Sequence, residues 1–204
     1  MVLDVPNSDR RAARREATKA EILVAAWDLV RREGLAGLSL RDLAHSVGMQ
    51  APSLYSYFAS KHAIFDAMFA QGSQEFVARE ATLEPSGDRL RDLQAGMRMF
   101  VEFCTEDPVR YQLLFQRTIP GFEPSPESFA IAVAGLEGVR GRLAAVGITD
   151  PQALDLLTAI ATGITDQQIS NDPGGDRWTR LLDDAMAMFL THVSQPDSPR
   201  SHTP

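Results

Sequence analysis

The stretch that decides the fold is residues 37–61, GLSLRDLAHSVGMQAPSLYSYFASK. Ser39 is followed three residues later by an aspartate, a capping-box pattern that predicts the start of a short helix. Gly48 ends that helix, because glycine adopts the positive φ that a sharp turn needs. A second short helix is expected over residues 51–58, where Pro52 falls in the first turn and removes no helical hydrogen bond.

Two short helices joined at a glycine, with a longer helix in front of them, form the pattern of a helix-turn-helix. Leu43 and the small Ala44 give the first helix of the pair an apolar inner face that the second helix can cross closely. Leu54 and Phe58 anchor the second helix to the same core. Its outer face offers short or hydrogen-bonding side chains, which suit base edges and phosphates in the major groove: Gln50, Ala51, Ser53, Ser56 and Tyr57.

Helical periodicity continues along the rest of the chain, and strand patterning is almost absent. We therefore predict an all-α fold of about nine helices. The first helix, opened or steadied by a capping-box pattern at Thr18, would end at Gly34. A three-helix helix-turn-helix domain is expected over residues 10–60 and a helical body over 61–194, with residues 1–9 and 195–204 as disordered tails. The later helices are expected near 61–82, 88–105, 108–116, 126–146, 151–170 and 176–193, with a proline-rich loop over 117–126.

The charge is distributed unevenly along the chain. The net charge is -7, which by itself argues against nucleic acid. Residues 1–62, however, hold nine Lys/Arg and seven Asp/Glu, whereas residues 63–204 hold eleven and twenty. Five basic residues fall in one ten-residue stretch: Arg10, Arg11, Arg14, Arg15 and Lys19. Such an asymmetry indicates contact with nucleic acid or a membrane, although a solvated basic tail would show it too.

Several classes of protein are not expected from this sequence. Cys104 is the single cysteine, which is typical of a reducing cytosol. No signal peptide opens the chain and no window reaches about 18 uncharged apolar residues, so we expect a cytoplasmic protein without a membrane span. His45, His62, His192 and His202 are not at metal-binding spacing, and no glycine-rich phosphate loop follows a strand. We therefore expect neither catalysis, nor a cofactor, nor a metal site.

Residues 37–61 resemble the DNA-binding signature of the TetR family, and the similarity extends over about residues 18–66. The most specific part is Leu54-Tyr55-Ser56-Tyr57-Phe58 followed by Lys61. Departures are mild: Ser39 stands where the family usually has threonine, and Met49 where it has a small β-branched residue. The rest of the chain is similar only in length and helical organisation. The resemblance implies a sequence-specific transcriptional regulator, most often a repressor that a small molecule releases from a roughly palindromic operator.

By position, the resemblance also implies roles for individual residues. Ser39 would meet a phosphate, and Arg41 would reach a base or the backbone beside the groove. The base-facing end of the recognition helix would comprise Gln50, Ala51, Pro52 and Ser53, with Ser56 on the same outer face. Tyr55, Tyr57 and Lys61 would contact phosphates. For each tyrosine the alternative is plain packing, and for Lys61 it is a solvated side chain.

The resemblance further implies a ligand cavity among the middle helices. Aromatic and methionine side chains at helical spacing are more often plain core, but their abundance near a proline-rich loop favours an apolar cavity. The effector would then be largely apolar, such as an acyl chain, a steroid-like molecule or a drug. The candidate ligand-binding residues are Met97, Phe100, Cys104, Tyr111, Phe115, Phe122, Phe129 and Val133.

A homodimer is expected through the last two helices. The eighth helix is apolar nearly all round, so it is predicted to be buried on more than one side. The alternative is a monomer with a fully wrapped central helix. The candidate dimer residues are Leu154, Leu157, Ala161, Ile164, Leu181, Ala185, Met188 and Phe189.

A helical adaptor or ligand carrier that does not bind DNA is the alternative function, and it would give no salt-sensitive, sequence-specific shift of DNA in a gel.

Overall fold

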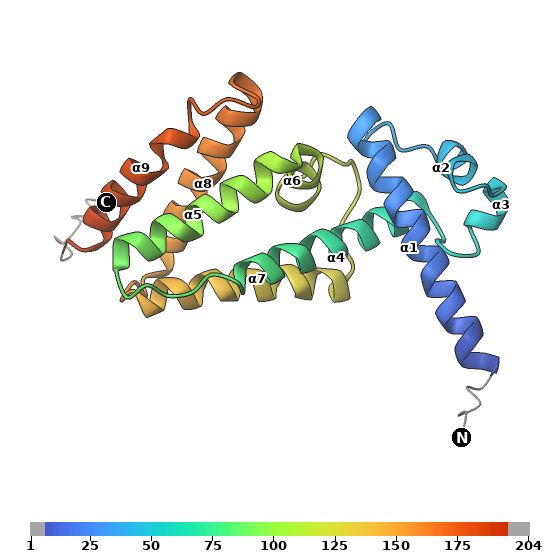
Figure 1. The fold of residues 1–204 in the computed structure, drawn as a ribbon, viewed down its shortest axis with the longest axis horizontal. Coiled ribbons are helices and arrows are strands. Elements are labelled where there is room, and N and C mark those ends of the chain that lie inside the picture. The colour runs from blue at the N-terminus through green and yellow to red at the C-terminus, as the bar shows by residue number, and fades with distance from the viewer. Residues whose placement is uncertain (1–6, 196–204) are drawn as a thin grey trace, which may run out of the picture. The chain divides into compact units, whose positions relative to one another are not determined.

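The computed structural model describes residues 7–195, which contain helices and no strand (Figure 1). The elements are α1 Asn7–Glu33, α2 Leu40–Ser46, α3 Ala51–Leu54, α4 Lys61–Glu80, α5 Arg89–Glu106, α6 Pro108–Phe115, α7 Pro126–Ala145, α8 Pro151–Asn171, the 3₁₀ helix η1 Thr179–Leu181 and α9 Leu182–Val193. The all-α prediction is confirmed. The chain forms two compact units: one extends to Ser73 and includes Val109–Ile131, and the other comprises Gln74–Pro108 and the residues from Ala132 on.

α1 begins earlier than the sequence pattern indicated. Residues 7–9, assigned to a tail, already belong to the helix, and the remaining predicted tail residues lie outside the described part except Gln195. Thr18 is therefore in the interior of the helix, where its hydroxyl donates to the carbonyl of Arg14 at 3.0 Å. Arginine and alanine are good helix formers, so a basic, apolar-poor segment can extend a helix whose later turns are held by packing.

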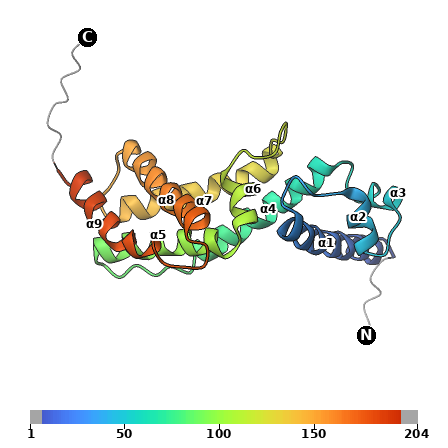
Figure 2. The same ribbon diagram turned by 90° about the horizontal axis from the view of Figure 1, so that it is seen from above.

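The first unit is built around α1, α2, α3 and the beginning of α4. α1 packs against α2, and α2 against α3 (Figure 2). Trp27 of α1 donates its indole N–H to Gln71 of α4 at 3.1 Å, which satisfies a polar group that burial would otherwise penalise. The core side chains come from all four helices: Ile22, Ala26, Val30, Leu43, Ala44, Leu54, Phe58, Ile64, Phe65 and Met68.

The loop between α6 and α7 is fastened to α4 within the first unit. The carboxylate of Asp66 accepts the backbone N–H of Ser125 at 2.7 Å and the Ser125 hydroxyl at 2.9 Å. Phe122 lies edge-on to Phe65 and to His62, with ring centroids 5.8 and 5.9 Å apart. The proline-rich segment after α6 is a loop, as its composition predicted. The contacts of Phe122 and Ser125 hold its later part against α4.

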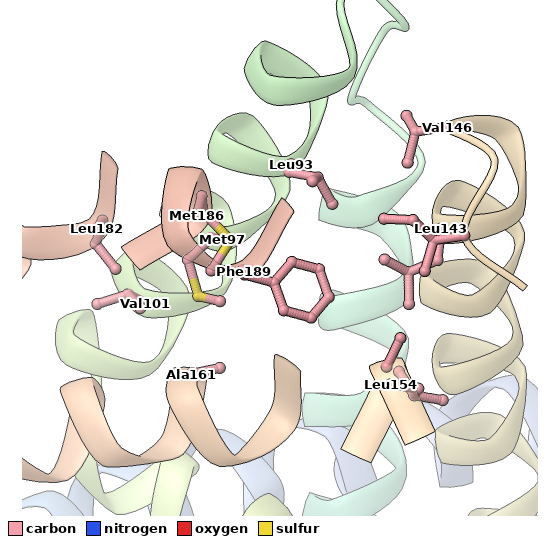
Figure 3. Packing of buried hydrophobic residues seen from close by; sticks show 12 residues of the cluster. Leu93, Met97, Val101, Leu143, Val146, Leu154, Ala161, Leu182, Met186 and Phe189 are labelled. Carbon is pink, nitrogen blue, oxygen red and sulfur yellow. The ribbon is translucent and has the colours of Figure 1, made fainter. Parts of the chain in front are cut away.

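The second unit has its core between α5, α7, α8 and α9. α5 packs against both α8 and α9, and Phe189 lies in the middle of a cluster of aliphatic and methionine side chains (Figure 3). The cluster includes Leu93, Met97, Val101, Leu143, Val146, Leu154, Ala161, Leu182 and Met186.

Two polar arrangements hold the connections of the second unit. Glu80 at the end of α4 accepts the Nε of Arg142 from α7 at 3.1 Å, and Arg142 also donates to the backbone carbonyls of Glu80 and Leu83. Gln168, buried in α8, donates to Asp172 and Gly175 carbonyls and accepts the N–H groups of Trp178 and Thr179. The connection from α8 to α9 thereby contains η1, where the sequence predicted a regular helix from residue 176.

Candidate nucleic-acid interface

The start of α2 and the turn after it are formed as their sequence predicted. Ser39 adopts an extended backbone, and its hydroxyl accepts the N–H of Asp42 at 3.3 Å. Gly48 has φ 67°, a left-handed conformation that any side chain would strain. The chain can therefore reverse in a few residues and place α3 across α2.

α3 itself is shorter than the sequence predicted. It covers Ala51–Leu54 with Pro52 in its first turn, and residues 55–57 form a turn. The N–H of Tyr57 binds the carbonyl of Leu54 at 2.9 Å, and the N–H of Phe58 binds the same carbonyl at 3.0 Å. These bonds keep Phe58 buried beside Leu54, so the predicted anchoring residues face the core.

The opposite side of this segment is open to solvent. Gln50, Pro52, Ser53 and Ser56 are exposed, and Tyr55 is 54% exposed. Ala51 and Tyr57 are half-buried, whereas Arg41 on α2 is exposed. Nearly all the side chains expected at DNA are thus accessible, and most of them lie on one short segment, residues 50–57.

Arg15 of α1 is a functional candidate that sequence reasoning did not single out. Its guanidinium donates to the backbone carbonyl of Ser56 and lies 5.1 Å from the ring centroid of Tyr57. A guanidinium over an aromatic face is attracted by the ring quadrupole. Arg15 therefore positions the Tyr57 ring. Arg15 and Ser56 are 41 positions apart in the sequence, which explains why no local pattern revealed the contact.

Lys61 is placed more firmly than a solvated lysine would be. Its ammonium donates to the carbonyl of Ala36 at 3.3 Å and lies 5.6 Å from the ring centroid of Phe65. An ammonium has three donors, so this bond leaves up to two for a phosphate oxygen. Ser60 caps α4 beside it by accepting the N–H of Ala63 at 3.1 Å.

The candidate ligand-binding residues are distributed over both units. Met97, Phe100, Cys104 and Val133 belong to the second unit, and Tyr111, Phe115, Phe122 and Phe129 to the first. Met97, Cys104 and Tyr111 are buried, whereas Phe129 is 56% exposed. Phe115 and Val133 are also exposed, and Phe100 and Phe122 are half-buried.

The candidate dimer residues divide into two groups. Leu154, Ala161 and Phe189 are buried within the second unit, where they pack into its own core. Leu181 and Met188 are exposed, Met188 by 73%, and the half-buried members are Leu157, Ile164 and Ala185. Leu156, which the sequence argument did not select for the dimer, is 36% exposed on α8.

No group of three or more His, Cys, Asp or Glu side chains within residues 7–195 could hold a metal ion. None of the described helices is long and apolar enough to cross a membrane.

Comparisons with known proteins agree with this geometry. Residues 22–68 match the model of the bacterial regulatory proteins of the tetR family. The transcriptional activator FasR of Mycolicibacterium smegmatis is 26% identical over 66% of this chain and 68% of its own length. A transcriptional repressor of Mycobacterium tuberculosis is 22% identical over 93% of this chain and 75% of its own.

The fold also has a solved counterpart. FadR of Bacillus subtilis, in a crystal structure with stearoyl-CoA, superposes with a TM-score of 0.63 over 84% of this chain and 97% of FadR at 14% identity. At that identity the likeness concerns the fold. The family match covers α2 and α3, which carry the exposed segment from Gln50 to Tyr57, together with the later turns of α1 and the first turns of α4. Residues 22–68 therefore form a DNA-binding domain of the tetR family of bacterial regulatory proteins, and the chain is a DNA-binding transcriptional regulator.

Proposed function

We propose that the chain is a homodimeric repressor that binds a roughly palindromic operator and is released from it by a small, largely apolar molecule. The observation that carries this proposal is the segment from Gln50 to Tyr57, here called the recognition segment, which is anchored by Leu54 and Phe58 and exposed on its other side. A short helix held in this way can enter the major groove and present side chains to base edges.

The homodimer is supported by apolar side chains that the single chain leaves open. Leu156 on α8, Leu181 of η1 and Met188 on α9 are 36%, 40% and 73% exposed. Large exposed apolar side chains on neighbouring helices are typical of surfaces that a partner covers. A second copy would bring a second recognition segment, and a two-fold pair of such segments suits two half-sites.

Two parts of the proposal, repression and an apolar effector, have precedents among the relatives and structural neighbours. The relative from M. tuberculosis is a repressor and FasR is an activator, and repression is the direction of control that we propose for this chain. B. subtilis FadR was crystallised with stearoyl-CoA. For this chain, the abundance of phenylalanine and methionine among the candidate ligand residues supports an effector with a large apolar part.

The test is selection of DNA by the full-length protein from a library of random duplexes. We expect enrichment of a motif with two inverted halves whose centres lie about one helical turn or a multiple of it apart, protected by a dimer in footprinting. Adding acyl-CoA should lower the affinity for that duplex. Absence of any enriched motif would overturn the proposal, and an asymmetric motif bound by a monomer would overturn the dimer.

Substitutions of base-reading and of phosphate-binding residues should weaken binding to the selected duplex in different ways. Gln50→Ala is expected to weaken binding by about 1–3 kcal/mol and relax base preference, if its amide contacts a base. Lys61→Met, which removes the ammonium but keeps an unbranched side chain, should weaken binding to all sequences alike and flatten the salt slope by about one per protomer. Affinities over a salt series on matched and scrambled duplexes separate the two. Altered base preference with an unchanged salt slope in Lys61→Met would contradict these roles.

A further inference from the structure

The first turns of α1 stand apart from the core of their unit. All residues from Arg10 to Ala17 are exposed, and Figure 1 shows these turns continuing beyond the other helices of the unit. The first buried side chain of α1 is Ile22, which is also where the match to the family model begins. Residues 10–17 are therefore not needed to form the helix-turn-helix core.

The charges on these turns oppose helix formation. Arg10 and Arg14, and likewise Arg11 and Arg15, are like-charged pairs at i, i+4, a spacing at which repulsion destabilises a helix. Cations near the N-terminus also meet the unfavourable end of the helix dipole. Glu16, the acidic residue that directly follows Arg15, pairs with Lys19 at 3.0 Å. Helix stability thus does not account for the cluster, whereas a negatively charged partner would.

Arg15 fixes which side of α1 faces the recognition segment. Its contacts with the Ser56 carbonyl and the Tyr57 ring bring that side of the helix against the end of the recognition segment. Arg11 lies one turn further along the same face, about 6 Å away at 1.5 Å per residue. Arg14 is next to Arg15 on the adjacent face. Neither Arg11 nor Arg14 makes a side-chain ion pair with another described residue.

We propose that residues 10–15, the arginine arm, bind the sugar–phosphate backbone of the duplex that flanks the half-site. This inference rests on the proposed DNA binding and extends it beyond the helix-turn-helix. Charge complementarity favours a polyanion, and continuity with the surface of Ser56 and Tyr57 makes that polyanion the DNA already held there. Arginine suits this role because its planar donor fork binds phosphate oxygens in pairs.

The test uses the duplex selected above in two lengths, one trimmed to its two half-sites and one extended by about ten base pairs, one helical turn, on each side. The variant is Arg11→Gln/Arg14→Gln. Its control, Arg32→Gln/Arg180→Gln, removes the same charge from exposed positions at the other end of α1 and in η1. Both are measured in the full-length protein over a salt series.

On the long duplex we expect the arm variant to bind at least about tenfold more weakly than the control, with a salt slope lower by about two per protomer. On the trimmed duplex the two should agree within about twofold, because the contacts removed lie in the flanks. The melting temperature of the arm variant should not fall, since like-charge repulsion is relieved. A structural role for these arginines would instead lower it.

Three results would overturn the arm. If the arm variant and the control bind the long duplex equally well, the arm does not contact DNA. If the arm variant loses the same affinity for both duplex lengths, the contact lies inside the half-site. Arginine-dependent binding to phosphatidylserine vesicles with unchanged duplex affinity would assign it to a membrane surface. If the library yields no selected duplex, the proposed DNA-binding function is overturned, and the proposed role of the arginine arm is overturned with it. The three results above would overturn the role of the arm alone and leave the DNA-binding function intact.

Discussion

Replacing Arg142 by methionine is expected to lower the free energy of unfolding by about 3 kcal/mol, because it leaves the buried Glu80 carboxylate without its cation. The Glu80 side chain is 8% exposed, and that of Arg142 is 32% exposed. Arg142 also donates to the carbonyls of Glu80, the last residue of α4, and of Leu83 in the connection that follows. Urea unfolding of the full chain at fixed protein concentration measures the loss.

The control lies two residues away on the same helix. Arg140 pairs with Glu137 at 2.7 Å, but both side chains are more than half exposed, so Arg140→Met should cost about 0.5 kcal/mol or less. The double variant Glu80→Met/Arg142→Met should recover much of the stability, since a buried ion pair can be replaced by apolar side chains of similar volume. Equal, small losses for Arg140→Met and Arg142→Met would contradict the account.

Phe189→Ala is expected to destabilise the protein by about 3–5 kcal/mol, the usual effect of a cavity left by a buried aromatic ring. Phe189 is 2% exposed in the centre of the second unit's core (Figure 3). Its truncation removes contacts with side chains of α5, α7 and α8 together. Thermal or urea unfolding gives the magnitude.

Met188 is the matched neighbour of Phe189, with 73% of its side chain exposed. In a single chain, Met188→Ala should change stability by less than about 0.5 kcal/mol. If α9 meets a partner copy, the same substitution raises the dissociation constant of the dimer, which sedimentation at several concentrations detects. A dimer unaffected by Met188→Ala would remove this residue from the interface, and a mild effect of Phe189→Ala would contradict its burial.

Local signals in the sequence predicted the cap, the turn and the inward-facing residues around α3, but not the end of α3 at Leu54. The Ser39 cap, the left-handed Gly48 and the proline in the first turn of α3 depend on neighbouring residues only, so they were readable without a fold. Helical periodicity also predicted which side chains of residues 50–57 are exposed, because Leu54 and Phe58 were expected to face the core.

The rest depends on contacts that periodicity cannot assign. α8 is apolar on several faces, which predicted burial on more than one side but not which side faces its own core; Leu154 and Ala161 face inward, and Leu156 does not. Arg15 could be counted as part of a basic stretch, yet the position of its guanidinium over the Tyr57 ring is a tertiary contact. The start of α1 was missed because exposed arginine-rich turns carry no apolar pattern.

Gln168 has a consequence for the order in which the chain folds. All of its partners lie within eleven residues of it in sequence, whereas Glu80 and Arg142 are separated by 62. Closing a short loop costs little chain entropy, so contacts at short separation form before those at long separation. The α8–α9 connection should therefore be native-like early in folding, and the joining of α4 to α7 should come later.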